Sequence, residues 1–460
     1  MLRILYGTAG TGKSAAIMDE IRRGADSGER YILLVPEQYS HEAERELCAV
    51  CGDGLSLYAE VLSFTGLARE ISSECGGAAN EYLDKGGRLL CMALAADGLY
   101  SRLRVYGAAR RKAELQTMLL GAVDEFKSAC VTSERLMQAS EACEGALGDK
   151  LHDLGLILEA YDGVVANGRA DPSDRLSVLA QQIGQCSMSE RTHVFVDGFT
   201  DFTAQERRVL EALLSKGVCL TVCLGCDELH GGSEVFALSR ITASALLKFA
   251  ADNGIKAQTE RFGGESTKAK PLGEFAENMF SYRAVEAGDA QGRIKIISAA
   301  DTNAECEFAA AEAVSLVRDT GCRWRDIAVC AKGFDDYRLP LESAFSRFGA
   351  PIYTARKADM LSKPLPMLIE SAYEIILGGW EADDVFDYLR TGFGGLDTDE
   401  CDELENYVFM WQLHGSAWTR AENWRLHPEG YGKQPDEASE QTLEQINLLR
   451  ETARRPLMRR

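Results

Sequence analysis

The chain has 460 residues, of which 46% are hydrophobic, and a formal net charge of −21. This length predicts two to four domains with sizeable cores, and the acidic balance argues against a protein that coats nucleic acid nonspecifically, though not against a local basic groove. The sequence opens without a leader pattern, and no apolar run approaches the roughly 18 residues that span a bilayer. We therefore expect a cytoplasmic protein that does not enter the membrane.

A glycine-rich sequence near the start, GTAGTGKS at residues 7–14, fits the P-loop pattern G-x-x-x-x-G-K-[ST] at every fixed position. An apolar run precedes it and a helical pattern follows it, as a P-loop requires, whereas a chance glycine-rich turn needs neither. Backbone N–H groups of such a loop cradle phosphates, Lys13 reaches the outer phosphates, and the Ser14 hydroxyl binds magnesium. The predicted nucleotide-binding residues of the loop are Gly7, Thr8, Ala9, Gly10, Thr11, Gly12, Lys13 and Ser14.

A second apolar run at residues 31–35 ends at Pro36. Its unbroken apolarity predicts a parallel strand covered on both faces, and ligands lie at the carboxyl ends of such strands. Gln38 is therefore a candidate nucleotide-site residue, with the plain start of a helix as an equal alternative. Residues 61–72 then predict a strand end and a short helix.

Residues 80–185 show helical spacing with almost no strand signal, which predicts an all-helical insertion between strands of the first sheet. The predicted helices cover residues 87–99, 113–128, 133–143 and 151–165, with a break at 171–173 before another helix. One basic cluster lies in this region, and we interpret it as a solvated helix end in preference to a nucleic-acid contact. Its members are Arg102, Arg104, Arg110, Arg111 and Lys112.

The apolar strand predicted at residues 193–197 ends in Asp197. An apolar strand ending in an acid, downstream of a P-loop, is the Walker B arrangement, in which the acid holds magnesium through water. ATPases that hydrolyse quickly usually carry a glutamate at the next position as a general base. Here that position is Gly198, and Glu206 would substitute only if the fold brings it back to the site.

The fourteen cysteines are scattered and are expected to be reduced thiols. Cys219, Cys223 and Cys226 have the spacing of a radical-SAM cluster, but they fall in or just after a predicted strand at residues 218–224, whereas cluster ligands need a flexible loop. The pair Cys48 and Cys51 has no second ligand pair nearby. We interpret all five as structural.

From residue 227 to residue 292 the sequence predicts a connector, with a helix at 236–253, a flexible stretch at 263–270 and a helix at 272–280. A second α/β unit follows, with strands predicted at 294–298, 326–331 and 352–353 and helices at 303–318 and 337–348. Further helices are predicted at 365–377, 382–390 and 399–413, and the basic tail at 454–460 shows no clear structure.

These elements predict an α/β P-loop NTPase fold with two parallel-sheet lobes and helical insertions. Residues 1–79 and 186–226 form the P-loop lobe, and residues 80–185 form a helical insertion within it. Residues 227–292 connect it to a second, incomplete lobe at 293–364, and residues 365–460 begin another helical insertion.

Five segments in a fixed order resemble a known family: the P-loop, LVPEQ at 34–38, VLSFTGLA at 61–68, VDGFTDFT at 196–203 and WRDIAV at 324–329. Over nearly all 460 residues the chain is similar to the B subunit of AddAB-type helicase–nucleases, relatives of superfamily 1 DNA helicases. The resemblance implies lobes of the 1A and 2A type with 1B and 2B insertions. It also implies ATP and magnesium as ligands, an A-subunit partner in a heterodimer, and DNA ends and single-stranded DNA as substrates. The implied role is the processing of double-strand breaks for recombinational repair, with recognition of the Chi sequence.

The chain also departs from that family. Family members are more than twice as long and end in a nuclease domain with a four-iron (4Fe-4S) cluster, so neither the cluster nor nuclease activity is expected of these 460 residues. The motor lobes of the family's B subunit do not drive unwinding, which agrees with Gly198 and leaves open whether the chain is itself an enzyme. Two alternatives stay open: a P-loop kinase or phosphotransferase, and a non-catalytic scaffold with a vestigial P-loop.

Overall fold

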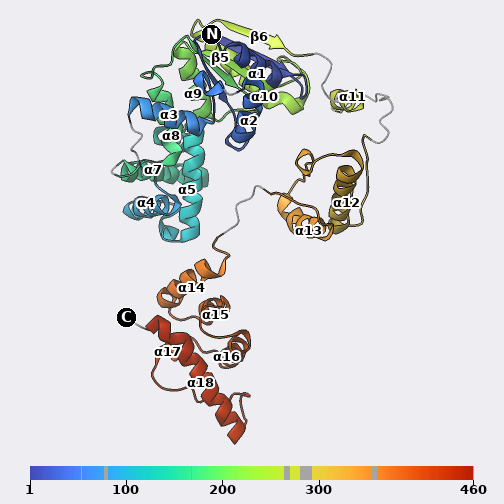
Figure 1. The fold of residues 1–460 in the computed structure, drawn as a ribbon. Helices are drawn as coiled ribbons and strands as arrows, with labels where there is room; N and C mark the ends of the chain where they lie inside the picture. The colour runs from blue at the N-terminus through green and yellow to red at the C-terminus, as the bar shows by residue number, and fades with distance from the viewer. Residues whose placement is uncertain are drawn as a thin grey trace. The chain divides into compact units, whose positions relative to one another are not determined.

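The computed structural model describes residues 1–52, 54–76, 81–166, 168–263, 270–279, 293–354 and 360–458. The chain divides into two compact units, Met1–Ile296 and Ile297–Arg460 (Figure 1). No helix in the described part of the chain is long and apolar enough to cross a membrane.

The first unit is built on a six-stranded sheet with the order β3-β2-β4-β5-β1-β6, in which every neighbouring pair is parallel. The sheet confirms the strands that the sequence predicts within residues 1–226 and adds β6, which the sequence does not predict. The strands are β1 (Leu2–Gly7), β2 (Arg30–Leu34), β3 (Ala59–Leu62), β4 (Thr192–Val196), β5 (Cys219–Gly225) and β6 (Ala257–Arg261).

Helices cover both faces of this sheet (Figure 1). On one face, Leu5, Leu33 and Phe195 pack with Ile17 of α1 (Lys13–Arg23) and Leu47 of α2 (Ser40–Cys51). On the other face lie α3 (Phe64–Cys75), α8 (Arg175–Gln182), α9 (Ala204–Ser215) and α10 (Ala237–Asp252). Burial on both faces explains why the central strands are unbroken apolar runs.

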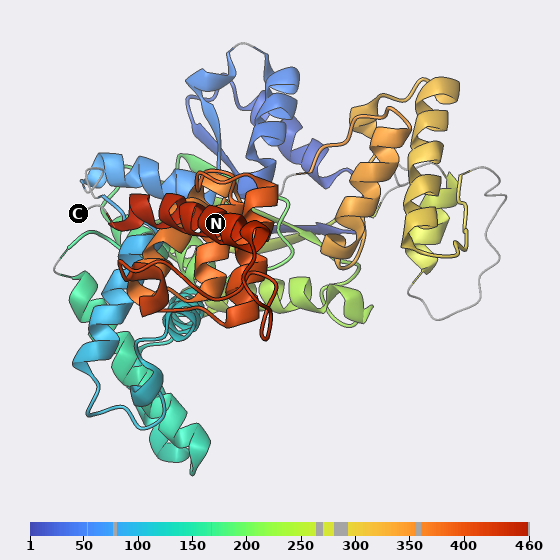
Figure 2. The same cartoon turned by 90° about the horizontal axis from the view of Figure 1, so that it is seen from below.

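The predicted helical region contains α4 (Lys85–Gly98), α5 (Ala113–Ser128), α6 (Ser133–Ala142) and α7 (Ala146–Val165) around a core of its own. Figures 1 and 2 show these helices, light blue to teal, to one side of the sheet. In the basic cluster, Arg104 pairs with Asp149, and Arg110 and Arg111 pair with Asp97. Arg104 and Arg111 are exposed, as a solvated helix end requires, whereas Arg110 is mostly buried.

In the second unit, α12 (Thr302–Thr320) and α13 (Phe334–Arg347) form as predicted, but the predicted second sheet is wrong for the residues that the structure describes. Residues 294–299, 327–331 and 351–354 contain no strand. Ile296 and Tyr353 are 95% and 89% exposed. These short apolar runs satisfy the strand pattern, but a strand also needs a hydrogen-bonded neighbour, and none lies beside them in the described ranges.

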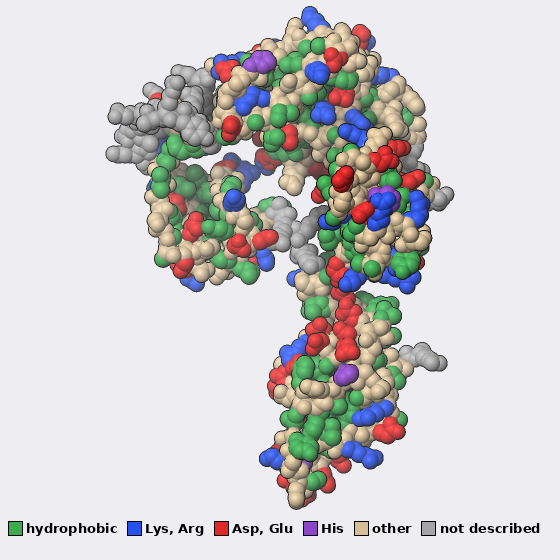
Figure 3. Space-filling view, turned by 180° about the vertical axis from the view of Figure 1, so that it is seen from behind, with side chains coloured by type: hydrophobic (Ala, Val, Ile, Leu, Met, Phe, Trp, Pro, Cys, Tyr) green, Lys and Arg blue, Asp and Glu red, His purple; other side chains and the backbone are tan. Residues whose placement is uncertain are grey.

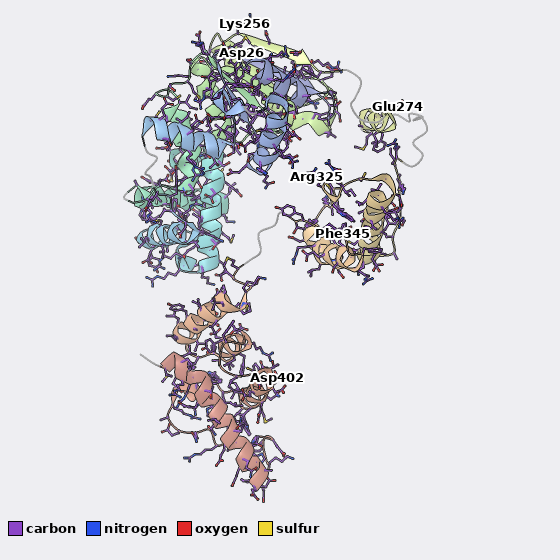
Figure 4. The ribbon with its side chains drawn as sticks, viewed as in Figure 1. Asp26, Lys256, Glu274, Arg325, Phe345 and Asp402 are labelled. Carbon is purple, nitrogen blue, oxygen red and sulfur yellow. The ribbon has the colours of Figure 1, made fainter. Side chains whose placement is uncertain are left out.

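A hollow of about 620 Å³ lies beside α12 and α13, and it is lined mostly by apolar side chains. Arg325 and Phe345, both labelled in Figure 4, are among its lining residues. The helix predicted at 272–280 corresponds to α11 (Lys270–Asn278) of the first unit. Apart from its ends, the flexible stretch predicted at 263–270 lies outside the described residues, as do connector residues 280–292.

The rest of the second unit is helical: α14 (Pro364–Gly378), α15 (Ala382–Arg390), α16 (Thr398–Trp411), α17 (Ser416–Thr419) and α18 (Glu437–Met458). Trp418 and Trp424 lie in its core at 0% and 1% exposure. The prediction that the tail lacks clear structure is wrong as far as residue 458, because α18 continues to Met458. Acidic side chains gather over α14 and α15 on the face that Figure 3 shows.

Candidate nucleotide site

The P-loop joins β1 to α1 at the carboxyl edge of the sheet, and its glycines are required for different reasons. Gly10 and Gly12 have φ angles of 84° and 85°, in the left-handed region that favours glycine. Gly7 has a packing reason instead, because a Cβ atom built on it would lie 2.3 Å from the Phe262 carbonyl oxygen. The backbone of Phe262 is fixed there, since its N–H donates to the Tyr6 carbonyl at 2.7 Å.

Lys13, the first residue of α1, turns its ammonium group into the concavity of the loop. Its Nζ donates to the carbonyl oxygens of Gly7 at 2.7 Å and Thr8 at 2.8 Å, and lies 3.4 Å from Thr11 Oγ1. Burial lowers the pKa of Lys13, and the nearby Cys223 and Asp197 act in the opposite direction. The ammonium group therefore sits where phosphate oxygens can take over the role of the loop carbonyls. The Ser14 side chain, one residue later, is exposed.

Asp197 follows β4 at the same edge of the sheet. Its N–H donates to the Leu34 carbonyl at 3.0 Å, so the ladder between β4 and β2 continues for one more residue. One carboxylate oxygen, Oδ1, accepts the Gly198 N–H at 2.9 Å. The structure thus places the predicted magnesium acid within electrostatic reach of Lys13.

The other two residues that the sequence suggested for this site, Gln38 and Glu206, do not join Lys13 and Asp197. Gln38 lies exposed in a short 3₁₀ turn, Glu37–Tyr39, and no hydrogen bond joins it to Lys13 or Asp197 among the described residues. Glu206 is engaged in a capping box at the start of α9, where its Oε2 accepts the Thr203 N–H at 2.8 Å. The T-x-x-E spacing already indicates that role. Its carboxylate therefore stabilises a helix end.

Sequence reasoning missed two residues of this site, Phe262 and Cys223. The sequence predicts only a structural role for Cys223, yet its thiol is an electrostatic neighbour of both Lys13 and Asp197. The signal that could have found it is its level in the sheet, because Cys223 pairs with Leu5, two residues before the P-loop begins. Phe262 follows a polar strand that gives no apolar pattern.

The residues present fit a magnesium nucleotide. A Cβ on Gly12 would meet nothing within 4 Å, so the loop leaves open space there, and Lys13 supplies a cation. In the part of the chain that the structure describes, no group of three or more His, Cys, Asp or Glu side chains could hold a metal ion. Magnesium binds proteins through one or two side chains, together with phosphates and waters. Ser14 and Asp197 are the protein groups available here.

A parallel sheet whose first strand runs through a G-x-x-x-x-G-K-S loop into a helix, with an acid at the end of a nearby strand, defines an α/β protein with a P-loop sequence at its sheet edge. Comparison with known proteins gives the family. The chain belongs to the family whose model is described as "ADDB, N-terminal", which matches residues 4–275.

Two relatives are each named as the B subunit of an ATP-dependent helicase/deoxyribonuclease. The protein from Acetivibrio thermocellus is 31% identical over 474 residues, and the protein from Desulforudis audaxviator is 33% identical over 483 residues. Each alignment covers 99% of this chain and 41% of the relative. The chain thus spans about two fifths of the length of these relatives. The family resemblance expected from the sequence is confirmed.

Proposed function

We propose that this chain is the amino-terminal, helicase-like part of the B subunit of a heterodimeric helicase–nuclease, and that it holds MgATP at the P-loop. The observation that carries the nucleotide proposal is the convergence of Lys13 and Asp197 at one sheet edge, with the glycine-rich loop between β1 and α1. The names of the relatives, which include ATP dependence and the position of one subunit among others, support the rest.

The loop holds the nucleotide through its backbone N–H groups and through Lys13, whose ammonium group already lies in the loop. Backbone N–H groups at the start of α1 contact the phosphates, where the positive end of the helix dipole favours them. Lys13 exchanges its bonds to the Gly7 and Thr8 carbonyls for bonds to phosphate oxygens. Ser14 and Asp197 hold the magnesium ion, which neutralises phosphate charge when bound.

The same site is poorly equipped to hydrolyse ATP. The position after Asp197 carries no side chain, and Glu206 is engaged at the start of α9. The chain therefore acts as a nucleotide-holding subunit with weak or no motor activity of its own. Its A-subunit partner supplies the power to unwind DNA ends.

We infer the DNA role from the family resemblance: the complex processes double-strand breaks for recombinational repair and recognises Chi. The basic cluster around Arg110 contributes little to DNA binding in this proposal, because three of its arginines are in ion pairs with Asp97 and Asp149.

Titration calorimetry with MgATP tests the nucleotide proposal. Lys13→Ala is expected to weaken binding at least about tenfold, a loss of about 1.4 kcal/mol. The matched control is Lys248→Ala, which removes an exposed lysine on α10 and should leave the affinity unchanged. Equal affinity of the parent chain and Lys13→Ala would overturn the ATP-binding claim, and no affinity in the parent would favour the scaffold alternative.

Co-purification tests the partner. The chain is mixed with the A-subunit protein of a helicase–nuclease and a blunt DNA duplex, and the mixture is separated by size-exclusion chromatography. A peak that contains both proteins supports the proposal. Separate elution of the two proteins at micromolar concentration, with and without DNA, contradicts it for these 460 residues.

A further inference from the structure

The strand β5 lies between the P-loop strand β1 and the strand β4 that leads to Asp197. Neighbouring strands are about 4.8 Å apart, so β1 and β4 are separated by roughly 10 Å. A side chain on β5 at the right level therefore lies between the loop and the acid. In the register of the sheet, Leu5 pairs with Cys223 and Val196 pairs with Val222, so one further step sets Asp197 level with Cys223.

Cys223 also lies on the same face of the sheet as Lys13 and Asp197. Cys223 packs with Leu5, Phe195 and Ile17, on the side that α1 covers, whereas Val222 packs on the opposite side. Asp197 comes two residues after Phe195, and successive side chains of a strand alternate between faces. Lys13, Asp197 and Cys223 thus share one face, and Cys223 is 3% exposed.

In a contact between Cys223 and Asp197, the thiol is the hydrogen-bond donor and the carboxylate is the acceptor. A cysteine thiol has an ordinary pKa of about 8.5, so the buried sulfur of Cys223 carries its proton at neutral pH. A protonated thiol can donate a hydrogen bond to an ionised carboxylate but is inert as a nucleophile. Cys226, by contrast, turns its thiol to the Glu228 carbonyl, 2.9 Å away.

We propose that Cys223 is a positioning residue of the nucleotide site: its S–H donates to the Asp197 carboxylate and holds that group in the orientation that receives magnesium. The Gly198 N–H is the second donor, to Oδ1, so the carboxylate is held from two directions. The remaining lone pairs of the carboxylate would be available to water on magnesium when the ion is bound. This inference rests on the proposed function, since it needs MgATP in the P-loop.

The test is the magnesium dependence of nucleotide affinity. ATP binding is titrated in magnesium and in EDTA, and the ratio of the two dissociation constants measures the contribution of the metal. Cys223→Ala and Cys223→Val both remove the donor, and valine also refills the space if alanine fails to fold. Both are expected to reduce the ratio several-fold, while the dissociation constant in EDTA stays near the parent value.

Two variants separate positioning from packing. Cys223→Ser keeps a donor in a smaller side chain and is expected to restore most of the ratio, whereas Cys226→Ala, the control, should behave as the parent. An unchanged ratio in Cys223→Val or Cys223→Ala overturns the inference even though the parent binds MgATP. A parent chain that binds no ATP overturns the proposed function, and this inference with it.

Discussion

Gly198 lies against Pro36. A Cβ atom built on Gly198 would be 3.2 Å from Pro36 Cδ and 3.8 Å from Tyr39 Cδ1, and the Gly198 backbone has a φ of 82°. The loop that follows β2 therefore covers the residue that follows Asp197. In this structure the position of the expected general base is closed by backbone conformation and by contact with a proline ring.

Restoring the missing glutamate is therefore not expected to create an ATPase. In Gly198→Glu, the left-handed φ and the contact with Pro36 should cost about 1–3 kcal/mol of folding free energy. ATP turnover should stay at the parent level. The new glutamate would start from a strained backbone and point toward Pro36, so its carboxylate is not expected to reach a water molecule beside the nucleotide. Phosphate release with and without DNA, together with urea unfolding followed by circular dichroism, measures both effects.

The matched control for this variant is Gly198→Asn, because asparagine tolerates the left-handed region better than other side chains. It should lose less stability than Gly198→Glu. Brisk DNA-stimulated turnover in Gly198→Glu would show that the loop after β2 yields easily and that only the side chain was missing.

Gly7 and Gly12 of the P-loop are constrained in different ways, so their alanine variants should differ in stability. Gly7→Ala brings a Cβ within 2.3 Å of the Phe262 carbonyl, whose own backbone is tied to Tyr6. Gly12→Ala meets no neighbour within 4 Å and suffers only the strain of its φ of 85°. We expect Gly12→Ala to lose about 1–2 kcal/mol of stability. Gly7→Ala should lose more and should also weaken MgATP binding, because the strand and the loop must move apart.

Thermal unfolding by circular dichroism and ATP titration of both variants check this order. If Gly7→Ala proves as stable as Gly12→Ala, then the residues after β6 do not hold the P-loop as the structure indicates.

The first sheet could be predicted from the sequence because its central strands are apolar on both faces. The exception is β6, where all five residues are exposed and apolar side chains are nearly absent, so that no pattern marks the strand. It is held by backbone hydrogen bonds, including that of the Leu2 N–H to the Lys256 carbonyl at 2.9 Å (Lys256 is labelled in Figure 4). Hydrogen bonds to a distant strand leave no trace in local composition.

The prediction of a second sheet was wrong for the opposite reason: here an apolar pattern is present but no strand forms in the described residues. Residues 294–299 and 327–331 carry apolar runs, but an apolar run shows only that a segment has something to bury, and a strand exists only beside another strand. The candidate site could be predicted only where local sequence motifs mark its residues. Lys13 and Asp197 come from motifs, whereas Cys223 enters the site through the order and register of strands, which the sequence does not display.

Asp153 anchors the loop that carries Arg104 of the predicted basic cluster. The carboxylate, on a residue with 0% exposure, accepts the backbone N–H groups of Arg104, Val105 and Tyr106 at 2.9, 2.7 and 3.1 Å. Burial by itself would raise the pKa of Asp153, but these donors outweigh it and the pKa is lowered. Asp153→Asn should cost about 1–3 kcal/mol, because one ionised acceptor is replaced by a weaker one and an N–H group faces donors.

The pH dependence of that cost has a definite sign. A carboxyl group whose pKa is lower in the folded state stabilises the fold above its unfolded pKa of about 4, and the contribution disappears as the pH falls through the folded value. The difference in unfolding free energy between the parent and Asp153→Asn should therefore be constant from about pH 5 to pH 7 and should shrink below about pH 4. A difference that does not change down to about pH 3 would argue against a carboxylate anchor.

Arg450 plays a comparable part in the second unit, where it is 2% exposed and bonds to backbone oxygens instead of a carboxylate. Its guanidinium group donates to the carbonyls of Glu422, Trp418 and Arg420 at 2.8, 3.0 and 2.6 Å. These bonds hold the end of α17 and the residues that follow it against α18. Burial lowers the pKa of Arg450 to about 10, but this value is still well above 7, so Arg450 remains charged at neutral pH.

All five tryptophans lie between residues 324 and 424, so tryptophan fluorescence reports on the second unit only. Arg450→Met removes the donors and leaves the carbonyls buried, and it should lower the stability seen by fluorescence by about 1.5–3 kcal/mol. Arg450→Lys keeps the charge but loses the planar fork, so it should recover only part of that loss. The control is Arg455→Met, at an exposed position of the same helix, which should unfold as the parent does. Equal midpoints for Arg450→Met and Arg455→Met would mean that apolar packing of Trp418 and Trp424 holds this loop without the arginine.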